Sequence, residues 1–235
     1  MFKFLLLILL TISTAWADEA QVKDMLQKNY PQLGTVKQVT PSPIPGLYEV
    51  VTQDHLFYTD SKVQYLIDGS IYDLKSMRNL TEARERKVFA IDFNSLPLNL
   101  ALKRVQGDGS RKLVIFTDPN CGFCKRLEHE LVNVDNITIY RLLYPVFPGS
   151  DKKVHAILCS KNPNQAWDNL LLHNVLPPVP AANCSTPQTS KVLALGEKLR
   201  VSGTPTLILA DGTLVPGYLP AAALEKALND AASGH

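Results

Sequence analysis

The chain has 235 residues, 46% of them hydrophobic, and its 24 Lys and Arg residues nearly balance its 22 Asp and Glu residues. This length and composition allow one full hydrophobic core and a second, smaller one, and they exclude a disordered or collagen-like chain. Because the formal charge is only +2, neither nucleic acid nor an anionic membrane surface is expected as a partner.

The first 17 residues, MFKFLLLILLTISTAWA, have the features of a secretory signal peptide. Lys3 precedes an apolar run, and Ala15 and Ala17 form an A-x-A cleavage site. The run is shorter than the roughly 20 apolar residues that a membrane-spanning helix needs; a buried amino-terminal helix is the alternative. We therefore expect an exported protein that begins near Asp18 and whose cysteines meet an oxidising compartment.

Residues 18–77 are predicted to form a small α+β module. A helix is expected from Gln21 to Tyr30, before Pro31. Short β-branched or aromatic segments then predict strands at Val36–Val39, Leu47–Thr52, Leu56–Thr59, Val63–Ile67 and Ile71–Leu74. Asp68-Gly69 between the last two segments predicts a hairpin turn. Because a module of about 60 residues buries little surface, pairing with a second copy would stabilise it.

Residues 78–106 are interpreted as a helical linker. Asn79 or Thr81 can cap a first helix, whose first turn carries acidic residues. A second helix is expected from Ser95, through Pro97 in its first turn, to Arg104. The linker would then join the first module to a second domain.

Residues 107–235 alternate between strands and helices, which predicts a sheet covered by helices in one domain. The expected elements are a strand at Lys112–Phe116, a helix at Gly122–Val132, a strand at Ile137–Leu143, helices near 151–160, 164–173 and 188–200, strands at Thr206–Ala210 and Thr213–Val215, and a helix near 220–231. The turn sequence Asp211-Gly212 predicts that the last two strands form a β-hairpin.

Cys121-Gly-Phe-Cys124 lies where a predicted strand ends and a helix begins. This spacing lets Cys121 project outward while Cys124 lies beneath it within bridging distance. The free amides and positive dipole end of the helix favour a nucleophilic thiolate at Cys121. Cys124 is predicted to be the resolving thiol, which expels a partner bound to Cys121. Asp118 is expected to form the turn before the helix, or else to influence the thiols electrostatically.

Other uses of the four cysteines fit the spacing less well. A c-type haem would need His at position 125, which is Lys. A zinc site would prefer a second close pair, whereas Cys159 and Cys184 are far apart, so no metal is predicted. A purely structural Cys121–Cys124 disulfide remains an alternative. Cys159 and Cys184 are left to pair with each other, and the chain-entropy model gives that disulfide roughly 3–4 kcal/mol.

A second local signal is the segment VSGTPTLIL, in which Pro205 immediately precedes an apolar strand. Proline cannot donate to a sheet, so Pro205 is expected at the first residue or the edge of that strand. The Thr204–Pro205 bond is a candidate cis peptide.

A family resemblance rests on FTDPNCGFCKRLEHEL, SGTPTLIL and DGTLVPGYLP, and on VTQDHLFYTDSKVQYLIDGSIYDL in the first module. The chain resembles the thioredoxin superfamily and, within it, the family of exported bacterial disulfide isomerases that includes DsbC and DsbG. The resemblance covers nearly all of the chain after residue 17. It implies an α+β protein with a dimerisation module at 18–77, a linker at 78–106 and a thioredoxin-like α/β catalytic domain at 107–235, assembled as a V-shaped homodimer.

The resemblance also assigns roles to residues near the motif. It makes Cys121 the attacking thiol and Cys124 the resolving thiol. It places a cis Pro205 beside Cys121, with Thr204 helping to hold the backbone of a bound substrate. Cys159 and Cys184 fall where the isomerases have a second, non-catalytic disulfide.

The two residues inside the motif are further candidate substrate contacts. Gly122 matches the isomerases, whereas Phe123 stands where they usually have Tyr, so the ring is kept and its hydroxyl is lost. This difference bears on redox tuning or on a substrate hydrogen bond and leaves the thiol chemistry intact.

The function that the resemblance implies is isomerisation or reduction of incorrect disulfides in the periplasm, with no cofactor. The clients would be misoxidised exported proteins, and a membrane thiol reductase of the DsbD type would return Cys121 and Cys124 to the reduced state. The alternatives are a thiol oxidase or a sulfenic-acid reductase of the same fold, and a holdase chaperone that binds unfolded chains.

Overall fold

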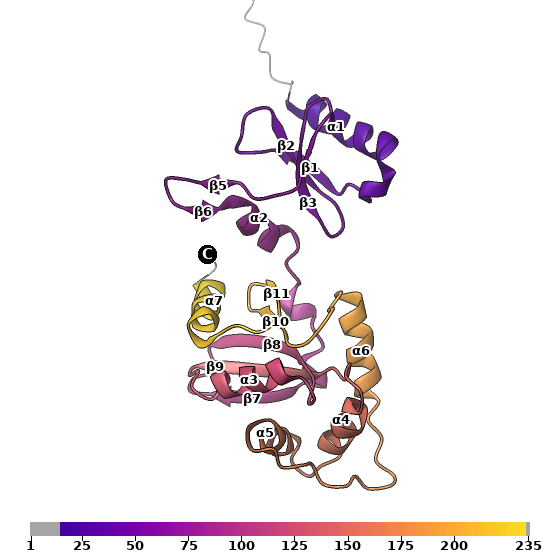
Figure 1. Ribbon diagram of the computed structural model, residues 1–235, viewed down its shortest axis with the longest axis vertical. Helices are drawn as coiled ribbons and strands as arrows, with labels where there is room; N and C mark the ends of the chain where they lie inside the picture. Colours follow the sequence, from indigo (N-terminus) through magenta and orange to yellow (C-terminus); the bar gives the residue numbers. More distant parts are fainter. Residues whose placement is uncertain (1–14, 234–235) are drawn as a thin grey trace, which may run out of the picture. The chain divides into compact units, whose positions relative to one another are not determined.

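The computed structural model of the chain describes residues 15–233 (Figure 1). The chain divides into two compact units, Met1–Phe89 and Ala90–His235. The predicted signal peptide lies outside the described residues, except for the backbone of its last three residues in the first helix, and it stays a prediction. In the part of the chain that is described, no helix is long and apolar enough to cross a bilayer.

The first unit is a helix packed on an antiparallel sheet, as predicted. The elements are α1 (Ala15–Asn29), a 3₁₀ turn (Pro31–Leu33), β1 (Gln38–Pro41), β2 (Leu47–Val51), β3 (Leu56–Asp60), β4 (Leu66–Ile67), β5 (Tyr72–Asp73), β6 (Arg78–Asn79) and α2 (Leu80–Val88). The strand order in the main sheet is β1-β2-β3-β4. Val22 and Leu26 of α1 are buried against Val50 and Phe57 of this sheet. One small core therefore holds the unit together.

The hairpin predicted at Asp68-Gly69 is wrong. The strands on either side of it belong to different sheets, because β4 pairs with β3 and β5 pairs with β6. The carboxylate of Asp60 accepts hydrogen bonds from the amides of Gln64 and Tyr65 at 2.8 and 3.0 Å, which closes the turn between β3 and β4. The backbone groups that the predicted hairpin would have used are thus engaged elsewhere.

Helix α2 begins where the sequence predicts, with Asn79 as its cap. The Asn79 side chain accepts a hydrogen bond from the Glu82 amide at 3.0 Å. The other predicted cap, Thr81, is buried, and its hydroxyl lies 2.6 Å from that of Tyr58. The cap at Asn79 leaves Thr81 free to join α2 to the sheet.

The second helix predicted for the linker is wrong. Two 3₁₀ turns, Phe93–Ser95 and Leu98–Leu100, precede β7 (Leu102–Gln106), which pairs over its whole length with a strand of the second unit. The Asp92 side chain caps a single turn there. Long-range strand pairing overrides the local helical pattern. The interval 78–106 is therefore a helix, two short turns and a sheet strand.

The second unit is a five-stranded mixed sheet with helices on both faces, and its elements after β7 agree with the prediction. They are β8 (Arg111–Thr117), α3 (Gly122–Leu131), β9 (Ile137–Leu143), α4 (Ser150–Leu158), α5 (Pro163–His173), α6 (Gln188–Lys198), β10 (Thr206–Leu209), β11 (Leu214–Pro216) and α7 (Ala221–Ser233). The strand order is β11-β10-β8-β9-β7, with β8 and β9 parallel. The hairpin predicted at Asp211-Gly212 is confirmed by the pairing of β10 with β11.

Alternating side chains of β8 supply the two halves of the core. Leu113 and Ile115 pack with α3 and α7 on one face of the sheet, and Val114 and Phe116 pack with α6 on the other. This arrangement positions α3 directly after the central strand β8 (Figure 1).

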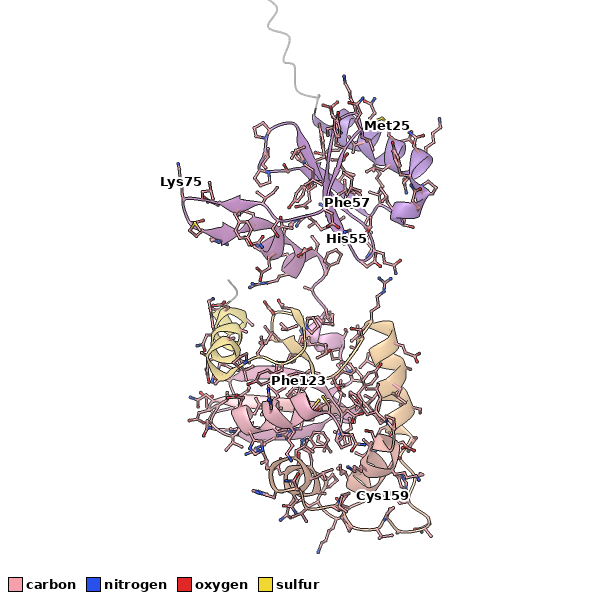
Figure 2. All side chains as sticks on the ribbon, in the orientation of Figure 1. Met25, His55, Phe57, Lys75, Phe123 and Cys159 are labelled. Carbon is pink, nitrogen blue, oxygen red and sulfur yellow. A yellow bond between two sulfur atoms is a disulfide. The ribbon has the colours of Figure 1, made fainter. Side chains whose placement is uncertain are left out.

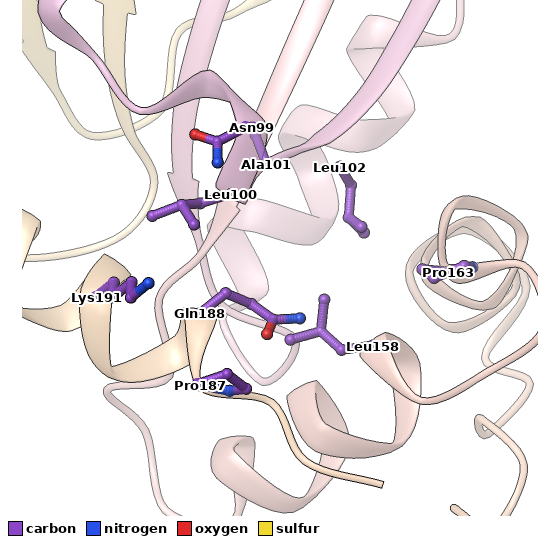
Figure 3. A pocket seen from close by; sticks show the side chains of 9 residues that line it. All are labelled: Asn99, Leu100, Ala101, Leu102, Leu158, Pro163, Pro187, Gln188 and Lys191. Carbon is purple, nitrogen blue, oxygen red and sulfur yellow. The ribbon is translucent and has the colours of Figure 1, made fainter.

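Helices α4 and α5 form a further layer beside β7 and β9, centred on the buried Trp167. A pocket of about 390 Å³ opens where the start of β7 meets the ends of these helices and α6, lined by Asn99, Leu100, Ala101, Leu102, Leu158, Pro163, Pro187, Gln188 and Lys191 (Figure 3). None of the candidate site residues lines it.

Candidate active site

The strand β8 and the helix α3 place the two motif cysteines. Cys121 is the N-cap of α3, and its Sγ accepts a hydrogen bond from the Cys124 amide at 3.3 Å. Its own amide donates to the carbonyl of Asp118 at 3.2 Å. Both cysteines are free thiols, and both are buried, with 4% of Cys121 and none of Cys124 exposed. Cys121 is thus less exposed than the sequence predicts.

The loop before β10 covers Cys121. The Thr204–Pro205 bond is cis, as the resemblance implies, and the Cys121 Sγ donates to the Thr204 carbonyl at 3.1 Å. The Pro205 carbonyl accepts from the Gly217 amide at 2.8 Å, which ties the loop to the end of β11. The structure therefore brings Cys121 together with Thr204 and Pro205, which are far away in the sequence.

Cys124 lies in a different environment, although only two residues separate it from Cys121. Its side chain is buried on the face of α3 that also carries Leu127 and Leu131. The amide of Asp118 donates to its Sγ at 3.5 Å. Burial raises the pKa of the Cys124 thiol from 9.0 to about 12. Cys124 therefore holds its proton at neutral pH.

Asp118 organises the loops around the motif. Its fully buried carboxylate accepts hydrogen bonds from the Asn120 amide at 2.6 Å, the Ser150 hydroxyl at 2.6 Å, and the Val146 and Phe147 amides at 2.7 and 3.0 Å. The turn predicted at Asp118 is confirmed. The sequence does not reveal its second role, which is to hold the loop before α4 against the start of α3.

A buried ion pair lies one turn further along α3. Glu128 receives two hydrogen bonds from the Arg141 guanidinium of β9, at 2.8 and 2.7 Å, and a third from the Trp167 indole of α5 at 2.9 Å. Arg141 also lies 3.7 Å from Asp168, whose pKa is raised because burial disfavours its charged form. This network fastens the active-site helix to the sheet and to α5.

Sequence reasoning missed the ion pair, although a signal is present. Glu128 falls on the buried face of α3, four residues after Cys124, and Arg141 interrupts the apolar strand ITIYRLL. A charged residue at a core position of each of two neighbouring elements predicts that they pair, because an isolated buried charge is costly.

Phe123 is the exposed member of the motif, and Figure 2 shows it at the start of α3. Its ring is 56% exposed, with the Arg126 guanidinium 5.7 Å and the Tyr218 ring 6.2 Å from the ring centroid. An exposed apolar side chain therefore lies two residues after Cys121.

The second cysteine pair lies elsewhere in the unit. Cys159, at the end of α4, is bonded to Cys184 with a Cα–Cα distance of 6.1 Å, which confirms the predicted pairing. Figure 2 shows Cys159 well away from Phe123. This bond excludes a zinc site built from all four cysteines.

Comparisons with known proteins agree with this geometry. A thioredoxin-like domain family matches residues 98–232, and the family of disulfide bond isomerase amino-terminal domains matches residues 13–82. The probable thiol:disulfide interchange protein DsbC of Bordetella avium is 43% identical over 191 residues, which are 81% of this chain and 68% of that protein. The thiol:disulfide interchange protein DsbC of Escherichia coli is 28% identical over 229 residues, 94% of each chain.

Solved structures resemble part of the chain. A disulfide interchange protein from Neisseria gonorrhoeae superposes with a TM-score of 0.55 and 32% identity, over 58% of this chain and 99% of that one. The catalytic domain of Proteus mirabilis ScsC has a TM-score of 0.50 and 21% identity, over 64% of this chain and 96% of that one, and at this identity it shows the fold alone.

Proposed function

The chain belongs to the DsbC family of thiol:disulfide interchange proteins, and from this premise we propose that it isomerises incorrect disulfides in exported proteins through Cys121, with Cys124 as the resolving thiol. The observation that carries the proposal is the contrast between the two thiols. Cys121 sits at the positive end of α3, beside Thr204 and Pro205, whereas Cys124 is sealed in the core with a raised pKa.

The first step forms a mixed disulfide. The Cys121 thiolate attacks one sulfur of a client disulfide, the client S–S bond breaks, and the other client sulfur leaves as a thiolate. The exchange causes no net oxidation or reduction, because one disulfide bond replaces another. Thr204 and Pro205 would hold the client backbone, with Gly122 and Phe123 on the other side of the reacting sulfur.

The second step decides between isomerisation and reduction. A client thiolate that displaces Cys121 leaves the client re-paired and the enzyme reduced. Attack by Cys124 instead releases a reduced client and oxidises the enzyme, with the proton of Cys124 lost as the new bond forms. Because burial raises the pKa of the Cys124 thiol, little of its thiolate is present at neutral pH, which favours re-pairing of the client over attack by Cys124.

Repeated reduction requires an electron donor, and we assign this role to a membrane thiol reductase of the DsbD type in the periplasm. The predicted signal peptide supports export to that compartment.

Dimerisation is assigned to the first unit. Its edge strand β4 presents Leu66 and Ile67 at 47% and 45% exposure, beside Tyr65 at 72%, and such an edge can pair with a second copy.

The proposal is tested by incubating the reduced protein, without residues 1–17, with a scrambled multi-disulfide substrate in a mild thiol buffer. Recovery of native substrate is expected, and Cys121→Ser should lower it to the rate of the buffer, because a hydroxyl does not exchange with a disulfide. Equal recovery with Cys121→Ser would contradict the proposal. Rapid oxidation or reduction of a dithiol substrate without such recovery would favour the oxidase or reductase alternative.

The holdase alternative needs a separate readout. Suppression of aggregation of a cysteine-free client, measured by light scattering, should be the same for the native protein and for Cys121→Ser if unfolded chains bind independently of the thiols. Suppression without any recovery of scrambled substrate would make the protein a holdase.

A further inference from the structure

An exposed aromatic pair borders the reactive sulfur. Phe123, two residues after Cys121, leaves more than half of its side chain in solvent and packs against the half-buried ring of Tyr218. Large apolar residues in exposed clusters beside a reactive group commonly mark a binding surface. The ring of Phe123 does not contribute to the core of α3, whose buried face carries Cys124 and Leu127.

Tyr218 is held in place from two directions. The residue before it, Gly217, donates its amide to the Pro205 carbonyl at 2.8 Å. The Tyr218 hydroxyl donates to the Glu130 carboxylate of α3 at 2.6 Å. The orientation of the ring is thereby fixed by contacts within the protein, and the ring lies beside that of Phe123.

Arg126 completes this surface on the side of α3. Its guanidinium lies over the Phe123 ring, and it forms no ion pair with any residue that the structure describes. A planar guanidinium beside aromatic rings stacks readily with a further aromatic group. Phe123, Tyr218 and Arg126, which we call the aromatic platform, thus group one exposed ring, one half-buried ring and one cation at the start of α3, where Cys121 is the N-cap.

We propose that the aromatic platform is a side-chain subsite that selects clients with an aromatic residue within two positions of the cysteine that attaches to Cys121. The inference rests on the proposed function and adds a client class to it. The mixed disulfide fixes the client cysteine at Cys121, and an extended chain advances about 3.3 Å per residue. A neighbouring client side chain therefore reaches Phe123, where aromatic pairing adds a preference of about three- to tenfold.

The test uses short disulfide-linked peptides that are identical except for Phe, Leu or Ala beside the cysteine. With the Cys124→Ser variant, which cannot resolve the mixed disulfide, the equilibrium constant for its formation is measured by mass spectrometry. The Phe peptide is expected to be favoured over the Ala peptide by about three- to tenfold. Phe123→Ala, added to this variant, should bring the equilibrium constant of the Phe peptide down to that of the Ala peptide.

Matched control variants test whether the preference for the Phe peptide comes from the aromatic platform or from any exposed apolar side chain. Val105→Ala removes a comparably exposed apolar side chain, 52% exposed on β7, and should keep the preference. Tyr218→Ala should reduce it, whereas Tyr218→Phe, which keeps the ring, should retain most of it. Unfolding midpoints of all variants verify that each one folds.

Two outcomes would overturn the subsite. They are equal formation of all three mixed disulfides with native Phe123, and a Phe preference that survives Phe123→Ala. Failure of every peptide to form a mixed disulfide would instead refute the proposed function, so the two failures are distinguishable.

Discussion

One cysteine of each pair in the second unit lies at a helix end, and the two ends are opposite. Cys121 is the N-cap of α3, where free amides and the positive end of the helix dipole favour negative charge on sulfur. Cys159 is the C-cap of α4, where the helix ends in carbonyl groups that disfavour such charge. The helix end therefore favours a thiolate at Cys121, whereas it disfavours one at Cys159, which forms a disulfide with Cys184.

The difference extends to what holds each helix. The Cys159–Cys184 disulfide joins α4 to the chain that precedes α6. In the proposed exchange, the bond between Cys121 and Cys124 opens and closes, so it cannot hold α3 in place. The buried Glu128–Arg141 pair does so instead. The ion pair that holds α3 in place therefore does not depend on the redox state of the two cysteines.

The largest effect on stability is expected from breaking the Glu128–Arg141 ion pair. Glu128→Gln should lower the free energy of unfolding by about 3–5 kcal/mol, because it leaves the charge of Arg141 buried without its main partner. The matched change Glu225→Gln removes an ion pair with Arg111 whose glutamate is 40% exposed, and it should cost less than about 1 kcal/mol. Urea unfolding at neutral pH measures both. Equal losses in the two variants would refute the role of the buried pair.

Removing the structural disulfide should have the next largest effect. Cys159→Ala with Cys184→Ala should cost about 2–4 kcal/mol, because the unfolded chain loses a cross-link that closes a long loop. Exchange by the folded variant should be unchanged. The matched double change of Cys121 and Cys124 to Ala should reverse the pattern, with exchange abolished and a smaller loss of stability. If the variant without Cys159 and Cys184 still folds but no longer exchanges disulfides, the two cysteine pairs do not have separate roles.

Asp118 should show an intermediate effect on stability. Asp118→Ala leaves the amides of Val146 and Phe147 and the hydroxyl of Ser150 without their acceptor, and about 2–3 kcal/mol should be lost. Ser150→Ala removes a single one of these bonds and should cost about 1 kcal/mol. Denaturant titrations of both variants measure these two losses in the free energy of unfolding. A loss for Asp118→Ala no greater than for Ser150→Ala would show that the carboxylate does not organise the loop.

The smallest effect concerns the pH dependence of the reduced protein. Because the folded-state pKa of Cys124 is about 12, against an ordinary value of 9.0, the folded state keeps a proton that the unfolded state releases as pH rises. This contribution to stability is complete below pH 9 and is lost above it. Between pH 9 and pH 10 the free energy of unfolding should fall by about 1 kcal/mol. Cys124→Ala should lack this component, and an identical decline in that variant would contradict the raised pKa.

Much of the site follows from local sequence, because its chemistry depends on short motifs. Cys121 and Cys124 after an apolar strand, and Pro205 before another, lie where the sequence predicts them. The pairing of Cys159 with Cys184 follows from elimination. These features depend on neighbours in the chain.

What the sequence did not predict depends on long-range contacts. The helix predicted at 95–104 is replaced by 3₁₀ turns and the start of β7, which pairs with β9. Asp68-Gly69 does not form a hairpin because β4 and β5 find other partners. The four donors that converge on Asp118 come partly from a loop about thirty residues away, a placement that no local pattern indicates.

The central claim is that Cys121 alone among the four cysteines is the attacking thiol. The direct measurement is brief treatment of the mildly reduced protein at neutral pH with less than one equivalent of iodoacetamide, followed by mass-spectrometric mapping of the label. The label is predicted on Cys121, with Cys124 unmodified and the Cys159–Cys184 bond intact. Preferential labelling of Cys124, or opening of the second pair under these conditions, would contradict the account.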